Sequence, residues 1–148
     1  MTMRNGVLET YLYDCYCAHR GGTTSTGSRR RDGYRAVGGV GTTNLYLEPG
    51  GSAPEELLRS VDHGFLVTEV LGLFAAIDPA SGDFSIPSSG FMIEGGEIAS
   101  PVRGVSIGGN LFELLHSVTC VGSDLTWHGA IGCPTVAVES VKLGGGEG

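Results

Sequence analysis

Residues 91–100 read Phe-Met-Ile-Glu-Gly-Gly-Glu-Ile-Ala-Ser, and this stretch predicts the central feature of the fold. Two short runs, Phe91–Glu94 and Glu97–Ser100, flank the pair Gly95-Gly96. Glycine adopts positive φ angles without steric cost, as the central residues of a tight hairpin turn require. The stretch therefore predicts a β-hairpin and, with it, an antiparallel sheet.

Further strands are predicted on both sides of this hairpin. Apolar runs that alternate or are rich in aromatic and β-branched residues favour strands, and turn residues such as the cluster at 78–83 separate them. The predicted strands are Gly6–His19, Asn44–Glu48, Phe65–Leu71, Val118–Val121 and Val136–Leu143. Residues 144–148 are expected to fray.

The sequence predicts two short helices. In the first, Ser52 and Glu55 have the spacing of a capping box, and Pro54 falls in the first turn, where its missing N–H costs nothing. An apolar stripe over residues 57–61 ends before Gly64, the expected residue after the helix.

The second predicted helix runs from Asn110, a favourable N-cap residue, to Ser117. Its three leucines, Leu111, Leu114 and Leu115, are expected to face the core. Together these elements predict an α+β fold that is mostly antiparallel β-sheet, barrel- or sandwich-like, with two short helices.

The composition indicates one soluble domain over residues 1–148. Glycine accounts for 26 of the 148 residues, which is typical of a chain with many turns and bulges. The formal net charge of −7 does not attract a phosphate backbone, so no nucleic acid partner is expected. The most apolar stretch, Gly64–Ile77, is too short to span a bilayer, so no membrane partner is expected either. Four cysteines without a visible secretory signal predict reduced thiols and a cytoplasmic protein.

The segment from about 20 to 41 differs from the rest of the chain. Its glycines and small polar residues bury little surface, so the sequence predicts a long, flexible Gly-rich loop. Loops of this length in a compact domain are usually functional or mobile. The only basic run, Arg29-Arg30-Arg31, is expected to be a solvated part of this loop.

Several short motifs follow one another in a fixed order along the chain. The run Gly6–His19 precedes the triplet Ser25-Thr26-Gly27, and further matching stretches are 43–50, 68–69, 82–85, 89–94, 101–103, 107–111, 121–125 and 134–135. The ordered set resembles the C-terminal domain of the TldD/PmbA metallopeptidase family, the modulator of DNA gyrase family. The resemblance implies cytoplasmic proteins that pair into dimers, in which zinc-bearing subunits cut unfolded or extended peptides.

The sequence departs from the zinc-bearing members of this family. Those members hold zinc with an H-E-x-x-x-H helix and a cysteine, leaving one position for an activated water. No H-E-x-x-x-H occurs in these 148 residues, and the upstream N-terminal domain that carries it is expected to be absent. Cys133 directly precedes Pro134, without the insertion that holds the zinc-bearing cysteine. This spacing resembles the zinc-free PmbA/TldE-like type, so no catalytic residue, no metal ligand and no cofactor is expected in this chain, and zinc only in a partner subunit.

Cys15, Cys17 and His19 form a C-x-C-x-H motif. On a strand this spacing places all three side chains on one face. Thiolate and imidazole are suitable zinc ligands, so the motif is a candidate metal site. Packing of reduced thiols in a half-buried strand is the alternative interpretation.

The other cysteines and histidines have simpler interpretations. Cys120 is expected in the core of a strand. Cys133 is expected in an extended conformation before Pro134, either inert or exposed and reactive. His63 is expected just after the first helix, where its partial charge suits the helix end. His116 and His128 have no partner spacing and are assigned no role.

Four carboxylates are candidate general acids or bases. Each terminates or interrupts a predicted strand, where a solvated carboxylate is common, so catalysis is only the alternative interpretation. They are Glu48, Glu69, Asp83 and Glu94. The sequence Ser88-Ser89-Gly90 does not form the G-x-S-x-G turn of a serine hydrolase.

Three hypotheses for the function remain open. In the first, the chain is a non-catalytic part of a zinc-dependent peptidase, which binds an extended peptide or docks on a zinc-bearing subunit or a second copy. In the second, it is half of a split metallopeptidase that a separately encoded N-terminal domain completes. In the third, it is a small metal-binding module built on Cys15, Cys17 and His19.

Overall fold

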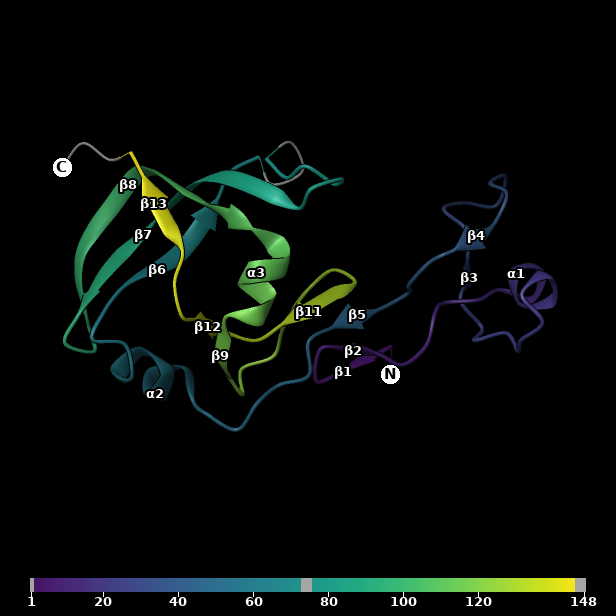
Figure 1. The fold of residues 1–148 in the computed structure, drawn as a ribbon, viewed down its shortest axis with the longest axis horizontal. Helices are drawn as coiled ribbons and strands as arrows, with labels where there is room; N and C mark the ends of the chain where they lie inside the picture. Colours follow the sequence, from purple (N-terminus) through teal and green to yellow (C-terminus); the bar gives the residue numbers. More distant parts are fainter. Residues whose placement is uncertain (1, 73–75, 146–148) are drawn as a thin grey trace. The chain divides into compact units, whose positions relative to one another are not determined.

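The computed structural model describes residues 2–72 and 76–145, which divide into two compact units (Figure 1). Unit 1 comprises residues 1–47 and 126–133, and unit 2 comprises residues 48–125 and 134–148. Unit 2 contains the long strands, whereas the strands of unit 1 have two or three residues each.

The centre of unit 2 is the predicted hairpin. β7 (Asp83–Glu94) and β8 (Glu97–Asn110) pair antiparallel along their whole length. Gly95 and Gly96 form the turn with φ angles of 57° and 79°, which confirms the prediction. Both strands are longer than predicted. In β7, Pro87 and Gly90 interrupt the apolar pattern on which the prediction relied, but the alternation of buried and exposed residues continues through them.

Two further strands complete a four-stranded sheet in the order β13-β8-β7-β6. β6 (His63–Val70) pairs antiparallel with β7, and β13 (Lys142–Gly144) pairs antiparallel with β8. The register shifts within the β6–β7 and β7–β8 pairs, and the sheet is visibly curved (Figure 1). Such bulges bend strands and increase their twist. The buried apolar residues of unit 2 are Leu57, Phe84, Ile86, Ile93 and Val105.

The first predicted helix is α2 (Pro54–Arg59), with Pro54 at its first position as predicted. The capping residues are shifted by one from the prediction. The N-cap is Ala53, whose backbone N–H donates to the Glu56 carboxylate at 3.0 Å. Ser52 instead bridges to Gly122, and Gly64 belongs to β6 rather than to the helix end.

The second predicted helix is α3 (Leu111–His116), and Asn110 caps it as predicted by accepting from the Phe112 N–H at 3.0 Å. The predicted inward position of Leu115 is wrong, because its side chain is 60 % exposed. The turn at 78–83 is confirmed, since the Asp78 carboxylate accepts from the Ala80 N–H at 2.8 Å.

The predicted last strand divides into two. β12 (Val136–Val138) pairs with β9 (Val118–Val121), a predicted strand, while β13 joins the four-stranded sheet. A register shift at Ala137/Val138 marks the end of the first pairing. Of the predicted frayed end, Gly144 closes β13, and residues 146–148 lie outside the described residues.

Unit 1 differs most from its prediction. Within the predicted strand Gly6–His19, only β2 (Val7–Leu8) is a strand, and Cys15–Arg20 forms helix α1. The Gly-rich segment is not one continuous loop, because β3 (Arg29–Arg30) pairs with β4 (Gly39–Val40).

The remaining strands of unit 1 form two small sheets. β2 pairs with β1 (Met3–Arg4), a hairpin that the sequence analysis missed. A three-stranded sheet runs in the order β10-β11-β5, with strands Thr126–His128, Ile131–Cys133 and Leu45–Tyr46. β5 is the predicted strand at 44–48, and it pairs parallel with β11.

The fold is α+β and mostly antiparallel β-sheet, as predicted, but residues 2–72 and 76–145 contain three short helices rather than two. The sheets are open in the described part of the chain, so the sandwich-like prediction fits better than a closed barrel. Among the described residues, no helix has both the length and the apolar character that crossing a bilayer requires.

The contact between β6 and β7 gives a first prediction. A Cβ atom at Gly90 would overlap the backbone carbonyl of Leu66, whereas one at Gly108 would lie 3.6 Å from the Phe84 carbonyl oxygen, an ordinary contact. Gly90→Ala is expected to lower the free energy of unfolding by about 1–3 kcal/mol. Gly108→Ala, the matched control, is expected to change it by less than about 0.5 kcal/mol. Urea denaturation followed by circular dichroism measures both, and equal stabilities would contradict the close pairing of β6 with β7 at Gly90.

Candidate functional site

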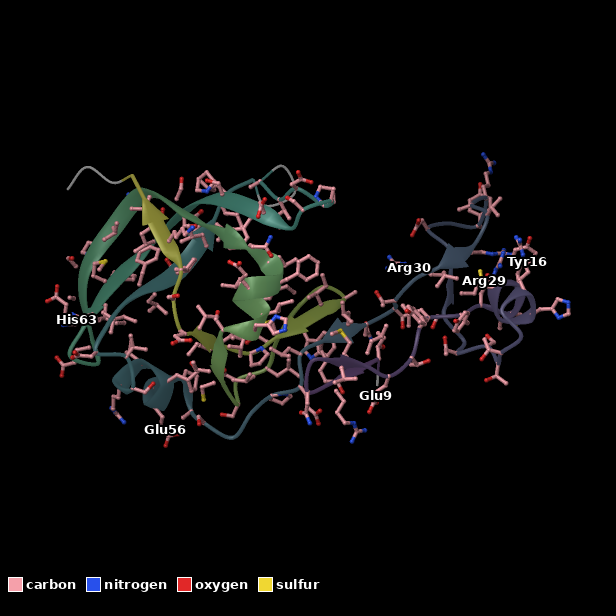
Figure 2. The ribbon with its side chains drawn as sticks, in the orientation of Figure 1. Glu9, Tyr16, Arg29, Arg30, Glu56 and His63 are labelled. Atoms are coloured by element: carbon pink, nitrogen blue, oxygen red, sulfur yellow. The ribbon has the colours of Figure 1, made fainter. Side chains whose placement is uncertain are left out.

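Asp14 is the most highly constrained polar residue of unit 1. Its side chain is buried and caps α1, with Oδ1 accepting from the Cys17 N–H at 2.8 Å. Its other oxygen, Oδ2, accepts from the guanidinium of Arg29, a residue labelled in Figure 2, at 2.8 Å. Arg29 is thus not simply solvated, as predicted for the basic run, but joins the Gly-rich segment to the start of α1.

The same cluster decides the interpretation of the C-x-C-x-H motif. The hydrogen bond from the Cys17 backbone is the main cause that lowers the pKa of Asp14, with Arg29 contributing. In turn, the hydrogen bond with the Asp14 carboxylate raises the pKa of the Cys17 thiol. A raised pKa disfavours the thiolate form, which zinc binding requires.

The helix also changes the geometry of this motif. The prediction of a strand that places Cys15, Cys17 and His19 on one face is wrong, because all three lie in α1. On a helix, residues 15 and 19 share a face, but residue 17 does not. In the described part of the chain, no three His, Cys, Asp or Glu residues are placed to hold a metal ion. These residues therefore do not fit a zinc site.

The Ser-Thr-Gly triplet closes a turn onto Tyr13. The Tyr13 carbonyl accepts from the backbone N–H of Thr26 at 3.1 Å and from the hydroxyl of Ser25 at 3.2 Å. The Tyr13 N–H donates to Thr26 Oγ1 at 2.7 Å, and Gly27 follows with a φ of 73°. The triplet is thus a structural turn that holds the segment preceding α1.

The other candidate cysteines and histidines are dispersed. Cys120 is half-buried in β9, with its thiol 3.7 Å from the Ser52 hydroxyl, and Cys133 is exposed at the end of β11. His63 begins β6 rather than following the helix, and its side chain is 78 % exposed near Asp62 (Figure 2). His116 bonds the Phe112 carbonyl within α3 at 2.7 Å, and His128 is exposed on β10.

The four candidate carboxylates do not converge either. Glu48, Glu69 and Glu94 are exposed. Asp83 begins β7, and hydrogen bonds from Asn110 and Ser81 lower its pKa, which opposes a role as a proton donor. Ser88 is buried in the middle of β7, and its hydroxyl donates to the Ile86 carbonyl at 2.9 Å, so it is not presented as a nucleophile.

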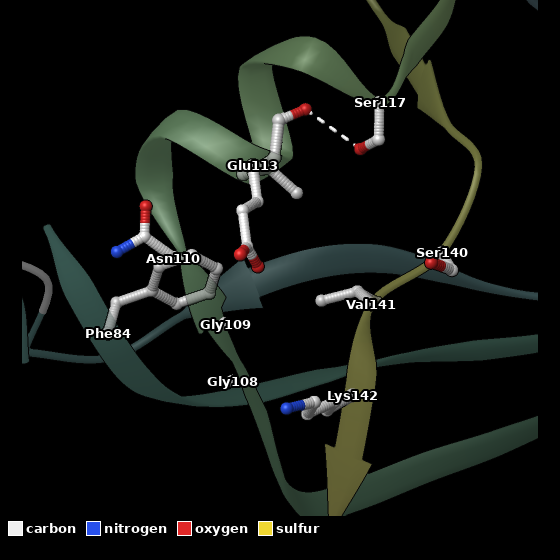
Figure 3. A pocket seen from close by; sticks show the side chains of 10 residues that line it. Phe84, Gly108, Gly109, Asn110, Glu113, Ser117, Ser140, Val141 and Lys142 are labelled. Carbon is white, nitrogen blue, oxygen red and sulfur yellow. Dashed lines mark hydrogen bonds between the residues drawn. The ribbon is translucent and has the colours of Figure 1, made fainter.

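A small pocket of about 240 Å³ lies beside α3 (Figure 3). Its floor is the backbone of Gly108 and Gly109, and Figure 3 shows the Glu113 carboxylate and the Lys142 ammonium directed into it from α3 and β13. Of its two hydroxyl side chains, Ser117 donates to the Leu114 carbonyl at 2.9 Å. The pocket offers one negative and one positive group but no nucleophile with an adjacent base.

The largest feature that sequence reasoning missed is the apolar surface of unit 1. Of its described apolar side chains only Ala18 is buried, while thirteen large ones are exposed. They are Met3, Val7, Leu8, Tyr11, Tyr16, Tyr34, Val37, Val40, Leu45, Tyr46, Leu47, Trp127 and Ile131. Single apolar side chains are common on protein surfaces, but a contiguous group of them marks a candidate interaction site.

The three-stranded sheet of unit 1 has apolar side chains on both faces. The Tyr46 and Trp127 rings meet with centroids 5.7 Å apart, across Gly132 of the strand between them. Leu45 and Ile131, paired in the register, lie on the opposite face and are 51 % and 59 % exposed. The sequence contains a signal of this arrangement. A strand with one face in water alternates apolar and polar residues, whereas the three consecutive apolar residues Leu45-Tyr46-Leu47 place apolar side chains on both faces.

Among the described residues of unit 2, β6 forms an edge of the four-stranded sheet. β6 is the last strand in the order β13-β8-β7-β6, and it pairs with β7 on one side only. Its eight residues leave a row of backbone groups that can pair with an added strand.

A comparison with known protein families identifies the family of this chain. Residues 2–145 match the family model described as the PmbA/TldA metallopeptidase C-terminal domain. This chain belongs to the PmbA/TldA family. The predicted resemblance to TldD/PmbA proteins is thereby confirmed.

Relatives of both types resemble this PmbA/TldA domain. Over 143 residues it is 30 % identical to the metalloprotease PmbA of Escherichia coli O157:H7, covering 97 % of this chain and 29 % of that protein. It is also 30 % identical over 158 residues to the metalloprotease TldD homolog of Buchnera aphidicola subsp. Schizaphis graminum, covering 97 % and 32 %. The chain thus spans about a third of these relatives.

Solved structures show the same fold. A Thermotoga maritima protein described as a putative modulator of a DNA gyrase superimposes with a TM-score of 0.86 at 36 % identity, covering 97 % of this chain and 32 % of that one. TldE from Thermococcus kodakarensis superimposes with a TM-score of 0.83 at 29 % identity, covering 97 % and 33 %.

The Asp14 cluster gives a prediction on pH. Because the pKa of Asp14 lies below 3.8 in the folded state, the folded chain binds fewer protons than the unfolded chain as Asp14 titrates. Its stabilising contribution is therefore complete above about pH 5 and is lost progressively as the pH falls toward and through the lowered pKa. We expect the protection factor of the Cys17 amide, corrected for the intrinsic exchange rate, to fall between about pH 5 and pH 3.

The matched variant is Asp14→Asn, which keeps the shape and removes the charge. Its Cys17 protection factor is expected to be lower than that of the wild type at about pH 5 and nearly independent of pH. A wild-type protection factor that stays constant over this range would contradict the role assigned to Asp14.

Proposed function

We propose that this chain is the non-catalytic C-terminal part of a zinc-dependent TldD/PmbA-type peptidase, where it docks on a partner subunit and holds an extended peptide. The single observation that supports this most is the exposed apolar surface of unit 1. The partner is a TldD-like zinc-bearing subunit or a second copy of the chain. The assignment is to the zinc-free PmbA/TldE-like type, and the expected location is the cytoplasm, where reduced cysteines are stable.

Docking follows from the energetics of unit 1. Ordering a residue costs about 1–2 kcal/mol of backbone entropy, and apolar burial has to offset it. Unit 1 buries one apolar side chain among its described residues, so its own contacts offset little of this cost. A partner that covers the Tyr46–Trp127 face would supply the missing burial, and aromatic residues are typical centres of such interfaces.

Peptide binding follows from the free edge of β6. An extended peptide that pairs with this edge gains backbone hydrogen bonds that do not depend on its side chains. Such a contact suits the unfolded or extended peptides that the resemblance to TldD/PmbA proteins implies as substrates. The peptide bond itself would be cut by groups of the zinc-bearing partner.

The split metallopeptidase is a second candidate that one observation favours. The chain matches about a third of the length of its relatives, and in this candidate a separately encoded N-terminal domain would supply the catalytic part. The small metal-binding module is less well supported, because the Cys17 thiol donates to Asp14 instead of being available as a thiolate.

The peptide hypothesis is tested with a fluorescein-labelled, unstructured peptide of about 12 residues. Fluorescence anisotropy is expected to show binding that weakens at least about tenfold when alternate amides of the peptide are N-methylated, because these amides cannot donate to β6. With zinc added, mass spectrometry is expected to show no cleavage. Equal binding of both peptides would contradict strand addition, and turnover that a chelator abolishes would contradict the non-catalytic assignment.

The docking hypothesis is tested by sedimentation of the chain at high micromolar concentration. We expect an oligomer whose dissociation constant rises about tenfold or more in Trp127→Ala. Phe112→Ala is the matched control, since Phe112 is an exposed aromatic residue on α3 of unit 2. A monodisperse monomer, or an equal effect of both substitutions, would contradict docking through unit 1.

A further inference from the structure

Unit 2 contains a cleft of about 1050 Å³ where a protein of this size would normally have its core. One wall is α2, with Leu57 and Leu58, and another is the concave face of the sheet, with Phe65 and Ile107. The segment from β12 to β13, with Val136 and Val138, closes the third side. These side chains are apolar, and all but Leu57 remain partly exposed to the cleft.

The size and the apolar lining of the cleft make it a candidate binding groove. Protein interiors contain few voids larger than a water molecule, and small-molecule sites span about 300–1,000 Å³. No large side chain in the described part of the chain is fully buried, so the core around the cleft is incomplete. The two helices beside it, α2 and α3, have six residues each and cannot cover strands of 12 and 14 residues. A sheet with one apolar face needs a second layer over that face.

The position of the cleft favours a helix as the occupant. It lies over the face of the sheet, where the backbone groups of the central strands are already paired. A segment placed there has to satisfy its own backbone hydrogen bonds, as a helix does and a single strand does not. For a helix about 10–12 Å in diameter that rises about 1.5 Å per residue, the volume corresponds to about two turns.

The charges at the rim favour a basic partner. Asp62 and Glu139 are exposed at the rim, with the His63 imidazole 3.6 Å from the Asp62 carboxylate, and no Lys or Arg lines the cleft among the described residues. The whole chain carries a formal net charge of −7. Opposite charges at the ends of an apolar segment would be attracted, whereas the carboxylate of a fatty acid would be repelled.

We propose that this cleft is the docking groove for about two turns of an amphipathic helix with an apolar face and Lys or Arg at its ends. The helix would come from the part of a TldD/PmbA-type polypeptide that this chain does not span, since the chain matches the C-terminal domain and about a third of the length of its relatives. The proposal concerns unit 2 and does not depend on the docking of unit 1 or on a peptide at β6.

The test uses a set of overlapping peptides of about 20 residues from the remaining two-thirds of the Thermotoga maritima relative. Binding of each labelled peptide to the intact chain is measured by fluorescence anisotropy. We expect the tightest peptide to carry apolar residues at i, i+3, i+4 and i+7 with Lys or Arg at its ends, and to gain helicity on binding. Its scrambled version is expected to bind at least about tenfold more weakly.

Substitutions locate the site without disturbing the core. The double variant Asp62→Lys and Glu139→Lys reverses the charge of the rim at exposed positions. It is expected to weaken the basic peptide at least about tenfold and to favour a version of it with Glu at the ends. Ile98→Ser, a change at an exposed apolar residue that does not line the cleft, is the control and is expected to leave both affinities unchanged.

Three results would overturn the proposal. One is that no peptide of the set binds about tenfold more tightly than its scrambled version. Another is that charge reversal at the rim leaves the preference unchanged. The third is that oleate, or a second copy of this chain, displaces the bound peptide from the cleft, which would make that competitor the occupant. The experiments on Trp127 and on peptide binding at β6 test the proposed function separately, so these three results would not affect it.

Discussion

The turn between β7 and β8 is the constraint on which unit 2 depends. Gly95 and Gly96 set the register of the two longest strands, and β6 and β13 then add to the sides of this pair. The same turn also fixes α2, because the Gly95 N–H donates to the Asp62 carbonyl at 2.7 Å and the Gly96 N–H to the Val61 carbonyl at 3.1 Å. A Cβ atom at position 96 would lie 2.9 Å from the Arg59 carbonyl oxygen, so a side chain there would push the helix away from the turn. One pair of glycines thus specifies the hairpin and positions the helix that covers its end.

The two units are stabilised in different ways. Unit 2 has a small apolar core around the sheet, whereas the described interactions of unit 1 are mainly polar, with the Asp14–Arg29 ion pair at their centre. Polar contacts of this kind specify a geometry but contribute little net stability in water. The apolar side chains that could stabilise unit 1 are on its surface instead. This exposure is the basis for the proposal that a partner covers unit 1.

The sequence predicted the features that short-range chemistry decides. The hairpin, the Asn110 cap of α3 and the turn at Asp78 depend on residues within a few positions of each other, and the structure confirms them. Helix α1 was missed because the aromatic residues before it continue a strand-like alternation, although Asp14 three positions before Cys17 is an N-cap signal. The Asp14–Arg29 pair joins residues 15 positions apart, and no local pattern indicates it. The division of the last strand between β12 and β13 likewise depends on which sheet each part meets. That the four candidate carboxylates lie apart is seen only in the structure, because their spacing depends on how the strands pair.

Amide hydrogen exchange of the chain alone tests most directly the claim that unit 1 depends on a partner. The amides of β7 and β8 are expected to exchange only by global unfolding of unit 2. Those of β5, β10 and β11 are expected to exchange at least about a hundredfold faster, and to slow at concentrations where the chain oligomerises. Protection of β5, β10 and β11 equal to that of β7 in the isolated monomer would contradict the account, because unit 1 would then be stable without anything covering its apolar surface.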